Sequence, residues 1–233
     1  MKTERIKVWD LPTRVFHWLL LILIVAAVAT GKIGGSAIEW HGKIGLSILG
    51  LIVFRLVWGF VGSSHARFAN FIPSPSSLRA YLRGSWTGVG HNPLGAVSVL
   101  TLLALIGIQV GTGLFSTDDI AFQGPLSRLT DKATSDWLTG VHKLSINLLF
   151  AVIALHIGAI AFYAKVKKED LVKPMVTGWK DVPAGSGDPA TGGGIIAAVI
   201  ALLIAVGAVY AGSGQWLAPP ETGVEKTTSA PAW

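Results

Sequence analysis

Histidines are the residues of this chain whose type and spacing point most directly to chemistry. His142 and His156 lie fourteen residues apart in one apolar segment. At about 1.5 Å and 100° per residue, an α-helix would place them roughly 21 Å apart along its axis and within about 40° of the same face. An ionisable side chain inside a membrane helix is costly and is usually functional. We therefore expect both imidazoles to point into a bundle, one near each membrane surface.

Two further histidines supply a partner at each of these depths. If every apolar segment spans the membrane, His17 lies near the same surface as His156, and His41 near the opposite surface. Two neutral imidazoles that face each other across a bundle core are what a six-coordinate b-type haem requires. The spacing thus predicts two haem b groups. Their axial ligands would be the pairs His17/His156 (inner) and His41/His142 (outer).

These histidines also have possible roles other than haem ligation. A single membrane histidine can simply form a hydrogen bond to a neighbouring helix. Zinc prefers four ligands, and apart from Glu39, two residues before His41, no carboxylate lies within five residues of these histidines in the sequence. A proton relay would favour Asp or Glu within the spans. The chain has no cysteine, which excludes disulfides, thiolate-bound clusters and covalently attached haem.

Cations near the two membrane surfaces are candidates for holding the haem propionates. Snorkelling or interfacial anchoring explains each of them equally well. The candidates are Arg14, Lys43, Arg55 and Lys143. Nearby glycines would let a flat macrocycle approach the backbone, or would simply pack helices. These glycines are Gly45, Gly107, Gly111, Gly113, Gly140 and Gly158.

The remaining inner histidines fall in or beside a loop. The run His91-Asn92-Pro93 predicts a helix start, with Asn92 as the cap and Pro93 in the first turn. We interpret His91 as either a structural residue or a neighbour of a quinone pocket. His65 is expected to be a solvated loop residue.

The elements that must position these residues are membrane-spanning helices. The chain is 51% hydrophobic and 14% charged, whereas soluble domains carry about a quarter charged residues. Its mean hydropathy is +0.58. Five apolar stretches come near the roughly 20 residues that cross a bilayer, which predicts an all-α membrane protein. They are Val15–Thr30, Gly42–Val61, Leu94–Phe115, Gly140–Ala164 and Gly194–Ala211.

The charges between these stretches indicate an orientation. Lys and Arg are concentrated before the first stretch, after the second and after the fourth, which predicts a cytoplasmic N-terminus and a periplasmic C-terminus. The net charge of +6 is thus interpreted as a topology signal, with no nucleic-acid partner expected. Domain boundaries follow from composition. We expect a four-helix domain at 1–180, a linker at 181–193, a fifth helix at 194–212 and a flexible periplasmic tail at 213–233.

Five stretches of sequence carry a resemblance to a known family. They are VWDLPTRVFHW, WHGKIG, RLVWGFVGSSHARF, GHNPLGA and VHKLSINLLFAVIALH. With them the chain resembles the prokaryotic di-haem cytochrome b family, which includes the b-type cytochrome subunits of nickel–iron hydrogenases and of membrane formate dehydrogenases. The resemblance covers roughly residues 5–180.

The resemblance implies a transmembrane four-helix bundle that holds two haems in the bacterial inner membrane. It implies the same four ligands, His17, His41, His142 and His156. It also implies quinone chemistry near one haem and a redox partner that docks outside. The fifth apolar segment departs from the family pattern, and five-helix forms look suited to a periplasmic c-type cytochrome.

The sequence leaves three functions open. The first is electron transfer through two haems between the quinone pool and a periplasmic partner, a c-type cytochrome or a hydrogenase. The second is a self-contained quinone oxidoreductase that oxidises superoxide or another small reductant. The third is a haem-free transporter or assembly factor. Membrane lipid surrounds the chain in each case, and a homodimer is compatible with all three.

Overall fold

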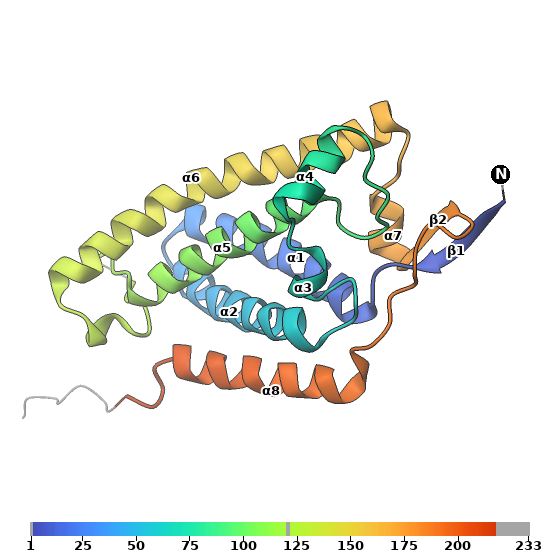
Figure 1. Cartoon of the computed structure of the whole chain (residues 1–233). Coiled ribbons are helices and arrows are strands. Elements are labelled where there is room, and N and C mark those ends of the chain that lie inside the picture. Colours follow the sequence, from blue (N-terminus) through green and yellow to red (C-terminus); the bar gives the residue numbers. More distant parts are fainter. Residues whose placement is uncertain (1, 120–121, 218–233) are drawn as a thin grey trace, which may run out of the picture.

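Long helices dominate the computed structural model, which describes residues 2–119 and 122–217. Within these ranges five helices are long and apolar enough to cross a membrane, which confirms the predicted fold class. All five run along the same long axis (Figure 1). They are α1 (Leu11–Ile33), α2 (Ala37–Val61), α5 (Pro93–Phe115), α6 (Lys132–Phe162) and α8 (Gly194–Gly212).

Polar caps set the starts of three of these helices. The side chains of Asp10, Asn92 and Asp131 each accept a hydrogen bond from the backbone N–H three residues further on, at 2.6–2.7 Å. Such caps satisfy a donor that the first helical turn leaves unpaired. The predicted cap at Asn92 is confirmed. Helices α1 and α6 begin before their apolar stretches because capped polar turns continue the helix beyond the hydropathy signal.

Short elements gather at one end of the bundle, which we call the sheet end. Here β1 (Thr3–Lys7) pairs antiparallel with β2 (Trp179–Pro183), although the two strands lie far apart in the sequence. The opposite end, which we call the loop end, carries the α5–α6 loop with the short helix η1 (Ser127–Leu129). The other short elements, all at the sheet end, are α3 (Phe68–Phe71), α4 (Pro75–Leu82), η2 (Tyr163–Lys167) and α7 (Val172–Thr177).

Two of the predicted segment boundaries bear on this arrangement. The first residues of the segment expected as a linker, 181–193, belong to strand β2. The segment expected as a flexible tail, 213–233, lies outside the described residues from position 218 onward. Helix α8 occupies the span expected for a fifth helix.

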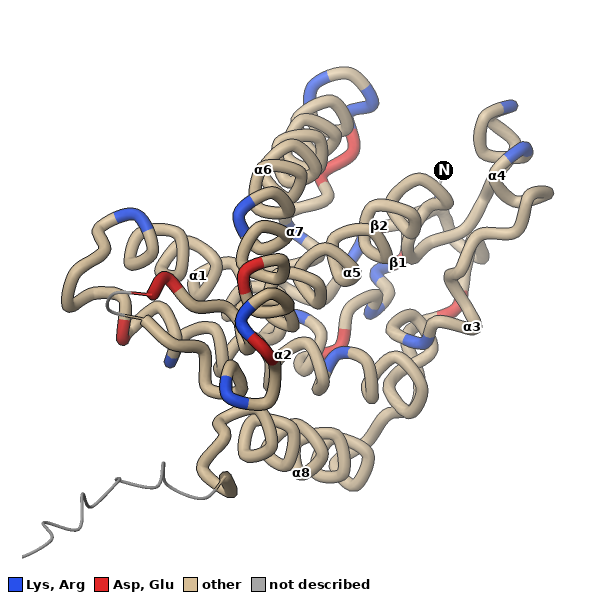
Figure 2. Tube along the Cα trace, turned by 90° about the vertical axis from the view of Figure 1, so that its left-hand side faces the viewer, with Lys and Arg blue, Asp and Glu red and all other residues tan. Residues whose placement is uncertain are grey.

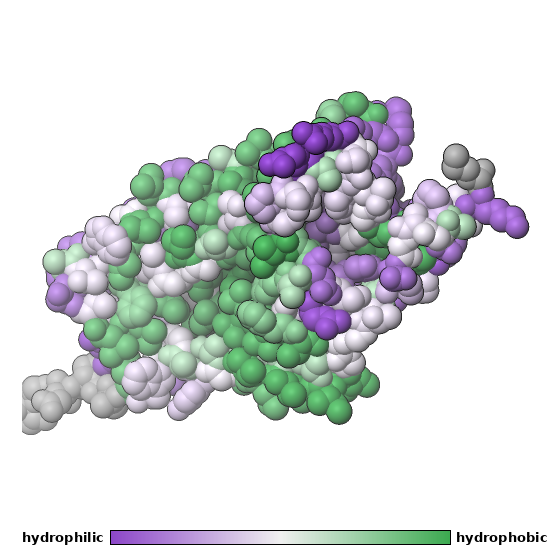
Figure 3. Space-filling view, in the orientation of Figure 1, coloured by the Kyte–Doolittle hydropathy of each residue, from purple (hydrophilic) through white to green (hydrophobic). Residues whose placement is uncertain are grey.

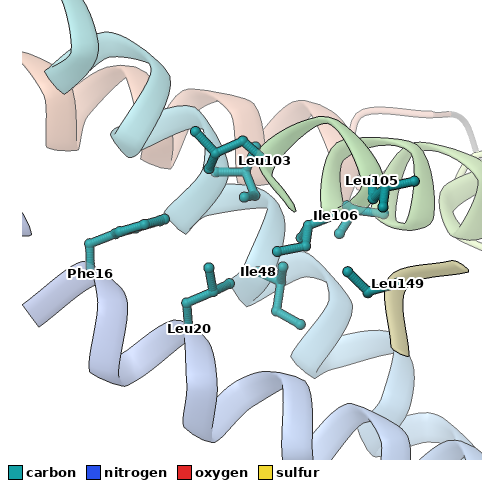
Figure 4. Close-up of a cluster of buried hydrophobic side chains, with 9 residues drawn as sticks. Phe16, Leu20, Ile48, Leu103, Leu105, Ile106 and Leu149 are labelled. Atoms are coloured by element: carbon teal, nitrogen blue, oxygen red, sulfur yellow. The ribbon is translucent and has the colours of Figure 1, made fainter. Parts of the chain in front are cut away.

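Helix α2 is the centre of the bundle, because it packs against α1, α5 and α8 while α6 packs against α5. Ile48 on α2 and Leu149 on α6 are buried in the middle of the bundle. Ile48 follows His41 by seven residues, and Leu149 follows His142 by seven. Seven helical residues advance about 10 Å, so these side chains lie halfway between the two predicted haem levels. They join a wholly apolar core (Figure 4) that also contains Phe16, Leu20, Ile52, Leu103, Leu105, Ile106 and Val110.

The outer surface is apolar along the helices and polar at the ends (Figure 3). At the loop end, Trp40, Trp137 and Trp216 are exposed, as expected for an aromatic belt at a membrane interface. Helix α8 lies closely against α2, where its Ala201 is fully buried. A Cβ at Gly50 would approach Val209 of α8 to 2.8 Å, so this contact depends on glycine.

Candidate functional site

The loop-end histidines face each other across a cavity. The ring centroids of His41 on α2 and His142 on α6 lie 6.1 Å apart, with their planes at 89°. Both rings line a cavity of about 550 Å³ to which α1, α2, α5 and α6 all contribute. This volume is within the range of about 300–1,000 Å³ that is usual for cofactor and ligand sites. The structure therefore brings this predicted pair together.

Backbone carbonyls fix the protonation of both rings. His41 Nδ1 donates to the Ala27 carbonyl at 2.8 Å, and His142 Nδ1 donates to the Gln109 carbonyl at 2.8 Å. Because a carbonyl can only accept, each Nδ1 carries the proton and each Nε2 offers its lone pair. A hydrogen bond of this kind is how proteins orient a histidine that ligates a metal. The pair is thus prepared to bind iron through Nε2.

Two glycines make room for these rings. A Cβ at Gly31 of α1 would lie 3.0 Å from His41 Nδ1, and a Cβ at Gly113 of α5 would lie 3.0 Å from His142 Cε1. A Cβ at either position would require the ring to shift by a few tenths of an ångström. Gly113 was among the glycines singled out from the sequence, whereas Gly31 was missed. By contrast, Gly45 in the cavity wall has open space in front of it.

Gln109 is a second feature that the sequence reasoning missed. Its side-chain amide nitrogen lies 3.1 Å from His142 Nε2, and its amide oxygen accepts a hydrogen bond from Ser145 at 2.5 Å. The signal was present, because a glutamine in the middle of an apolar span needs polar partners. His142 Nε2 is thus hydrogen-bonded to the Gln109 amide in this structure, and an iron bound at this atom would take the place of that amide.

The sheet-end histidines form the second level. His17 on α1 and His156 on α6 lie close enough to interact electrostatically. His17 Nδ1 is buried without a hydrogen-bond partner, and the ring meets Trp18 edge-on at 5.1 Å. Trp18 in turn donates to the Met175 carbonyl at 3.2 Å. This pair therefore shares a level, but its ring nitrogens are not fixed in the way that the loop-end ones are.

The candidate cations fall into different places. Lys143 lines the loop-end cavity, as does Lys32, which the sequence reasoning missed. Lys43 instead lies over the ring of Trp40, with Nζ 4.9 Å from the centroid. At the sheet end, Arg14 Nη1 donates to the Val176 carbonyl at 2.5 Å and so ties α1 to α7. Arg55 is buried inside the bundle.

The two loop histidines of the sheet end are both enclosed. His91 packs between Trp9 and Phe71, with each ring centroid 4.6 Å away. Burial, with smaller contributions from Arg55 and His65, lowers the pKa of His91 to about 3, so its imidazole is neutral at physiological pH. His65 lies in a loop, as expected, but it is partly buried instead of fully solvated, and its Nδ1 donates to the Val8 carbonyl at 3.1 Å.

Comparison with known proteins places the chain in a family. The family described as "Prokaryotic cytochrome b561" matches residues 8–178, which is most of the chain. The chain belongs to this family. It is thus a multi-pass membrane protein of a family that binds haem b. Helix α8 lies beyond the matched region.

Two curated relatives of this cytochrome b561 family member carry the same description. A "Probable Ni/Fe-hydrogenase B-type cytochrome subunit" of Azotobacter chroococcum mcd 1 is 23% identical, over 77% of this chain and 90% of the relative. The protein of that description from Azotobacter vinelandii is 22% identical, over the same shares. No solved structure matches significantly. The relatives bear out the resemblance seen in the sequence.

The residues present fit haem b at the loop end. Among the residues that the structure describes, no three His, Cys, Asp or Glu side chains gather to hold a bare metal ion. An iron bound here would therefore take its other ligands from a macrocycle. The cavity offers the imidazoles of His41 and His142, a mostly apolar wall and two lysines, Lys32 and Lys143, for acidic groups. At the sheet end, the buried Nδ1 atom of His17 has no hydrogen-bond partner within the described structure.

Proposed function

We propose that this cytochrome b561 family member transfers electrons across the membrane through two b-type haems. The observation that carries the proposal is the pair of histidine levels. Helix α6 contributes His142 to one level and His156 to the other, roughly 21 Å apart by helical rise. Each finds an opposing histidine, His41 on α2 or His17 on α1.

The chain's own residues would do three things for such haems. The four histidines would hold the two haem irons, and carbonyls of neighbouring helices orient the loop-end pair. The apolar core around Ile48 and Leu149 separates the levels and keeps water and protons out of the electron path. Burial and nearby charge set the potential of each site. When bound, haem supplies the one-electron chemistry at its iron.

The orientation of the path in the membrane is inferred from charge. Lys and Arg are numerous at the sheet end, and the α5–α6 loop at the opposite end mixes both signs, as the view onto the loop end shows (Figure 2). By the positive-inside rule, this bias favours a cytoplasmic sheet end and a periplasmic loop end in a bacterial inner membrane. We infer that quinone exchanges electrons at the sheet-end haem and a periplasmic redox protein at the loop-end haem.

The partner is proposed from the relatives and from α8. Both relatives are described as subunits of a nickel–iron hydrogenase, which favours a redox protein as the loop-end partner. The added helix α8 covers one face of α2, a face that a partner's membrane helix cannot then use. A soluble c-type cytochrome needs no such face and fits this five-helix form better than a membrane-anchored hydrogenase does.

A second function is favoured by the mouth of the loop-end cavity. Lys32 and Lys143 both line it, and two cations beside a redox centre would attract a small anion such as superoxide. The chain would then be a self-contained superoxide:quinone oxidoreductase. Quinone-dependent consumption of superoxide by the purified chain alone would favour this function over partner-dependent transfer.

Vesicles provide the direct test of transmembrane transfer. The purified chain is inserted into liposomes that contain ferricyanide, and dithionite, which does not cross the bilayer, is added outside. We expect the trapped ferricyanide to be reduced with the wild type but not with His41→Ala or His156→Ala, because each variant loses one haem. Equal rates in all three, with an intact bilayer, would exclude a path through the two sites.

A further inference from the structure

Unpartnered polar atoms gather at one end of the molecule. Within the described parts of the chain, six buried side-chain nitrogens or oxygens have no hydrogen-bond partner, and all six come from segments at the sheet end. Native proteins rarely leave such groups unpaired, so a cluster of them needs an explanation. The atoms are Thr13 Oγ1, Arg14 Nε, His17 Nδ1, Arg55 Nη1, Arg67 Nε and His91 Nδ1.

Arg55 is the central member of this group because of its depth. It follows His41 by fourteen residues on α2, just as His156 follows His142 on α6, and these two helices run in the same direction. Where α6 presents its second histidine, α2 therefore presents a guanidinium, turned by about 40° from the face of His41. The side chain is only 2% exposed.

The nearest carboxylate does not satisfy Arg55. Asp10 already accepts from the backbone N–H of Thr13 at 2.6 Å and from Trp58 Nε1 at 3.0 Å, and it also accepts from the Ser63 hydroxyl. Asp10 attracts Arg55 only through space, since no ion pair joins them in the described structure. Asp10 is thus a brace between α1 and the end of α2.

Aromatic rings hold the guanidinium in place without completing its hydrogen bonds. The centroid of Phe68 lies 5.1 Å from Arg55 Cζ and that of Phe71 lies 5.9 Å away. Cation–π contacts offset only part of the free energy that burial of an ion costs. A buried guanidinium therefore still calls for an anion.

His91 lies near Arg55 and adds a buried imidazole nitrogen that has no hydrogen-bond partner among the described residues. It packs on Phe71, one of the rings that flank Arg55, and its Nδ1 is shut off from solvent. Thr13 lies one turn before His17 on the same face of α1, between the sheet end and that ligand. A hydroxyl, an imidazole and a guanidinium thus lie at or just beyond the sheet-end histidine level, and they would bind acidic groups of a haem held there.

We propose that Arg55 and His91 form a buried carboxylate-binding site, and that its ligands are the propionates of the sheet-end haem. The inference rests on the proposed function, which supplies the haem. It assigns haem propionates of the sheet end to Arg55 and not to Arg14, Lys43 or Lys143. It also assigns His91 a role in positioning haem, whereas the sequence allowed either a structural role or a place beside a quinone pocket. Charge-assisted hydrogen bonds from Arg to a carboxylate are among the strongest that proteins make.

The test compares two arginines in the full-length haem-loaded protein. Arg55→Met removes the buried charge at similar volume, and Arg79→Met removes an exposed charge of the same end as the matched control. We expect the midpoint potential of the sheet-end haem to fall in Arg55→Met, because a lost cation favours ferric over ferrous iron. The loop-end potential should not move. His156→Ala and His41→Ala identify which transition belongs to which haem.

Two further variants keep the proposal testable if Arg55→Met does not fold. Arg55→Lys keeps the charge but loses the forked geometry, and it should keep the sheet-end haem with altered infrared bands of isotope-labelled haem carboxylates. Asp10→Asn/Arg55→Met removes both charges. If Arg55 only balances Asp10, the double variant will show the wild-type potential, which would overturn the proposal.

The outcomes for this site and for the proposed function are separable. A wild-type protein without haem defeats the proposed function itself. A wild type with two haems, whose sheet-end potential and carboxylate bands are the same in Arg55→Met, Arg55→Lys and Arg79→Met, defeats only this inference. His91→Phe should lower sheet-end haem occupancy while His91→Gln, which retains a donor, should largely restore it.

Discussion

The two histidine levels of this bundle are organised in opposite ways. At the loop end the chain itself completes the site, because main-chain carbonyls bind both Nδ1 atoms and a glycine backs each ring. At the sheet end, six buried polar atoms of the described chain still lack partners. The loop-end histidines are thus oriented by the protein alone. The sheet-end level instead leaves buried polar atoms free for a bound group that supplies hydrogen-bond acceptors.

The difference originates in which helix supplies the second histidine. Helix α2 gives His41 to the loop end, and one fourteen-residue step later it gives Arg55 instead of another histidine. The sheet-end level takes its second ligand, His17, from α1. The sheet-end site therefore has an arginine, Arg55, beside its histidines. We expect the redox potential of a haem there to depend on charge more than the potential of a loop-end haem does.

The largest effect is expected from removing the space behind the loop-end rings. Gly31→Ala and Gly113→Ala each place a methyl group about 3.0 Å from a ring atom and should displace the histidine from its carbonyl. We expect a several-fold loss of loop-end haem, with the sheet-end haem retained. Haem-to-protein ratios and reduced spectra measure this.

Gly207→Ala is the matched control, since that glycine on α8 has open space before it. It should keep both haems. If Gly31→Ala also kept both at wild-type ratio, the loop-end site would not be preorganised in the way that the contacts indicate.

A smaller effect is expected from the brace at the sheet end. Asp10→Ala removes a helix cap worth about 1 kcal/mol and leaves the buried donors of Trp58 and Ser63 unpaired at about 1–3 kcal/mol each. Asp131→Ala removes an exposed cap alone. Thermal unfolding in detergent should show Asp10→Ala as the more destabilised of the two, and equal stability would mean that the brace contributes nothing.

The smallest effect is expected at Gln109. Gln109→Leu removes the side-chain contact with His142 Nε2 but leaves the main-chain carbonyl that binds Nδ1. Loop-end haem content should therefore stay at the wild-type level, with a small shift in potential. Loss of this haem would show that the side chain, and not the backbone, orients the ring.

Much of this architecture could be predicted because its signals are local. Apolar runs predicted the five spans, fourteen-residue spacing predicted the histidine levels, and the Asn92 cap was visible in three consecutive residues. The β1–β2 pairing joins the two ends of the four-helix domain, and no local pattern announces such a contact.

The missed site residues have a common cause. Gly31 and Gln109 lie on helices that neighbour a histidine and not on the histidine's own helix, so their importance depends on how the helices pack. Lys43 and Lys143 each follow within two residues of a loop-end ligand, yet only Lys143 lines the cavity. The position of each lysine around its helix axis decides whether the side chain reaches the cavity, and a hydropathy pattern does not contain that information.

Haem stoichiometry tests the central claim most directly. The full-length protein is purified in detergent, its reduced-minus-oxidised spectrum is recorded, and its haem is extracted and quantified per chain. Two opposed histidine pairs predict two b-type haems in the wild type, one in His41→Ala or His156→Ala, and none when both are replaced. A wild type without b-type absorbance, or a single variant that keeps both haems, would contradict it.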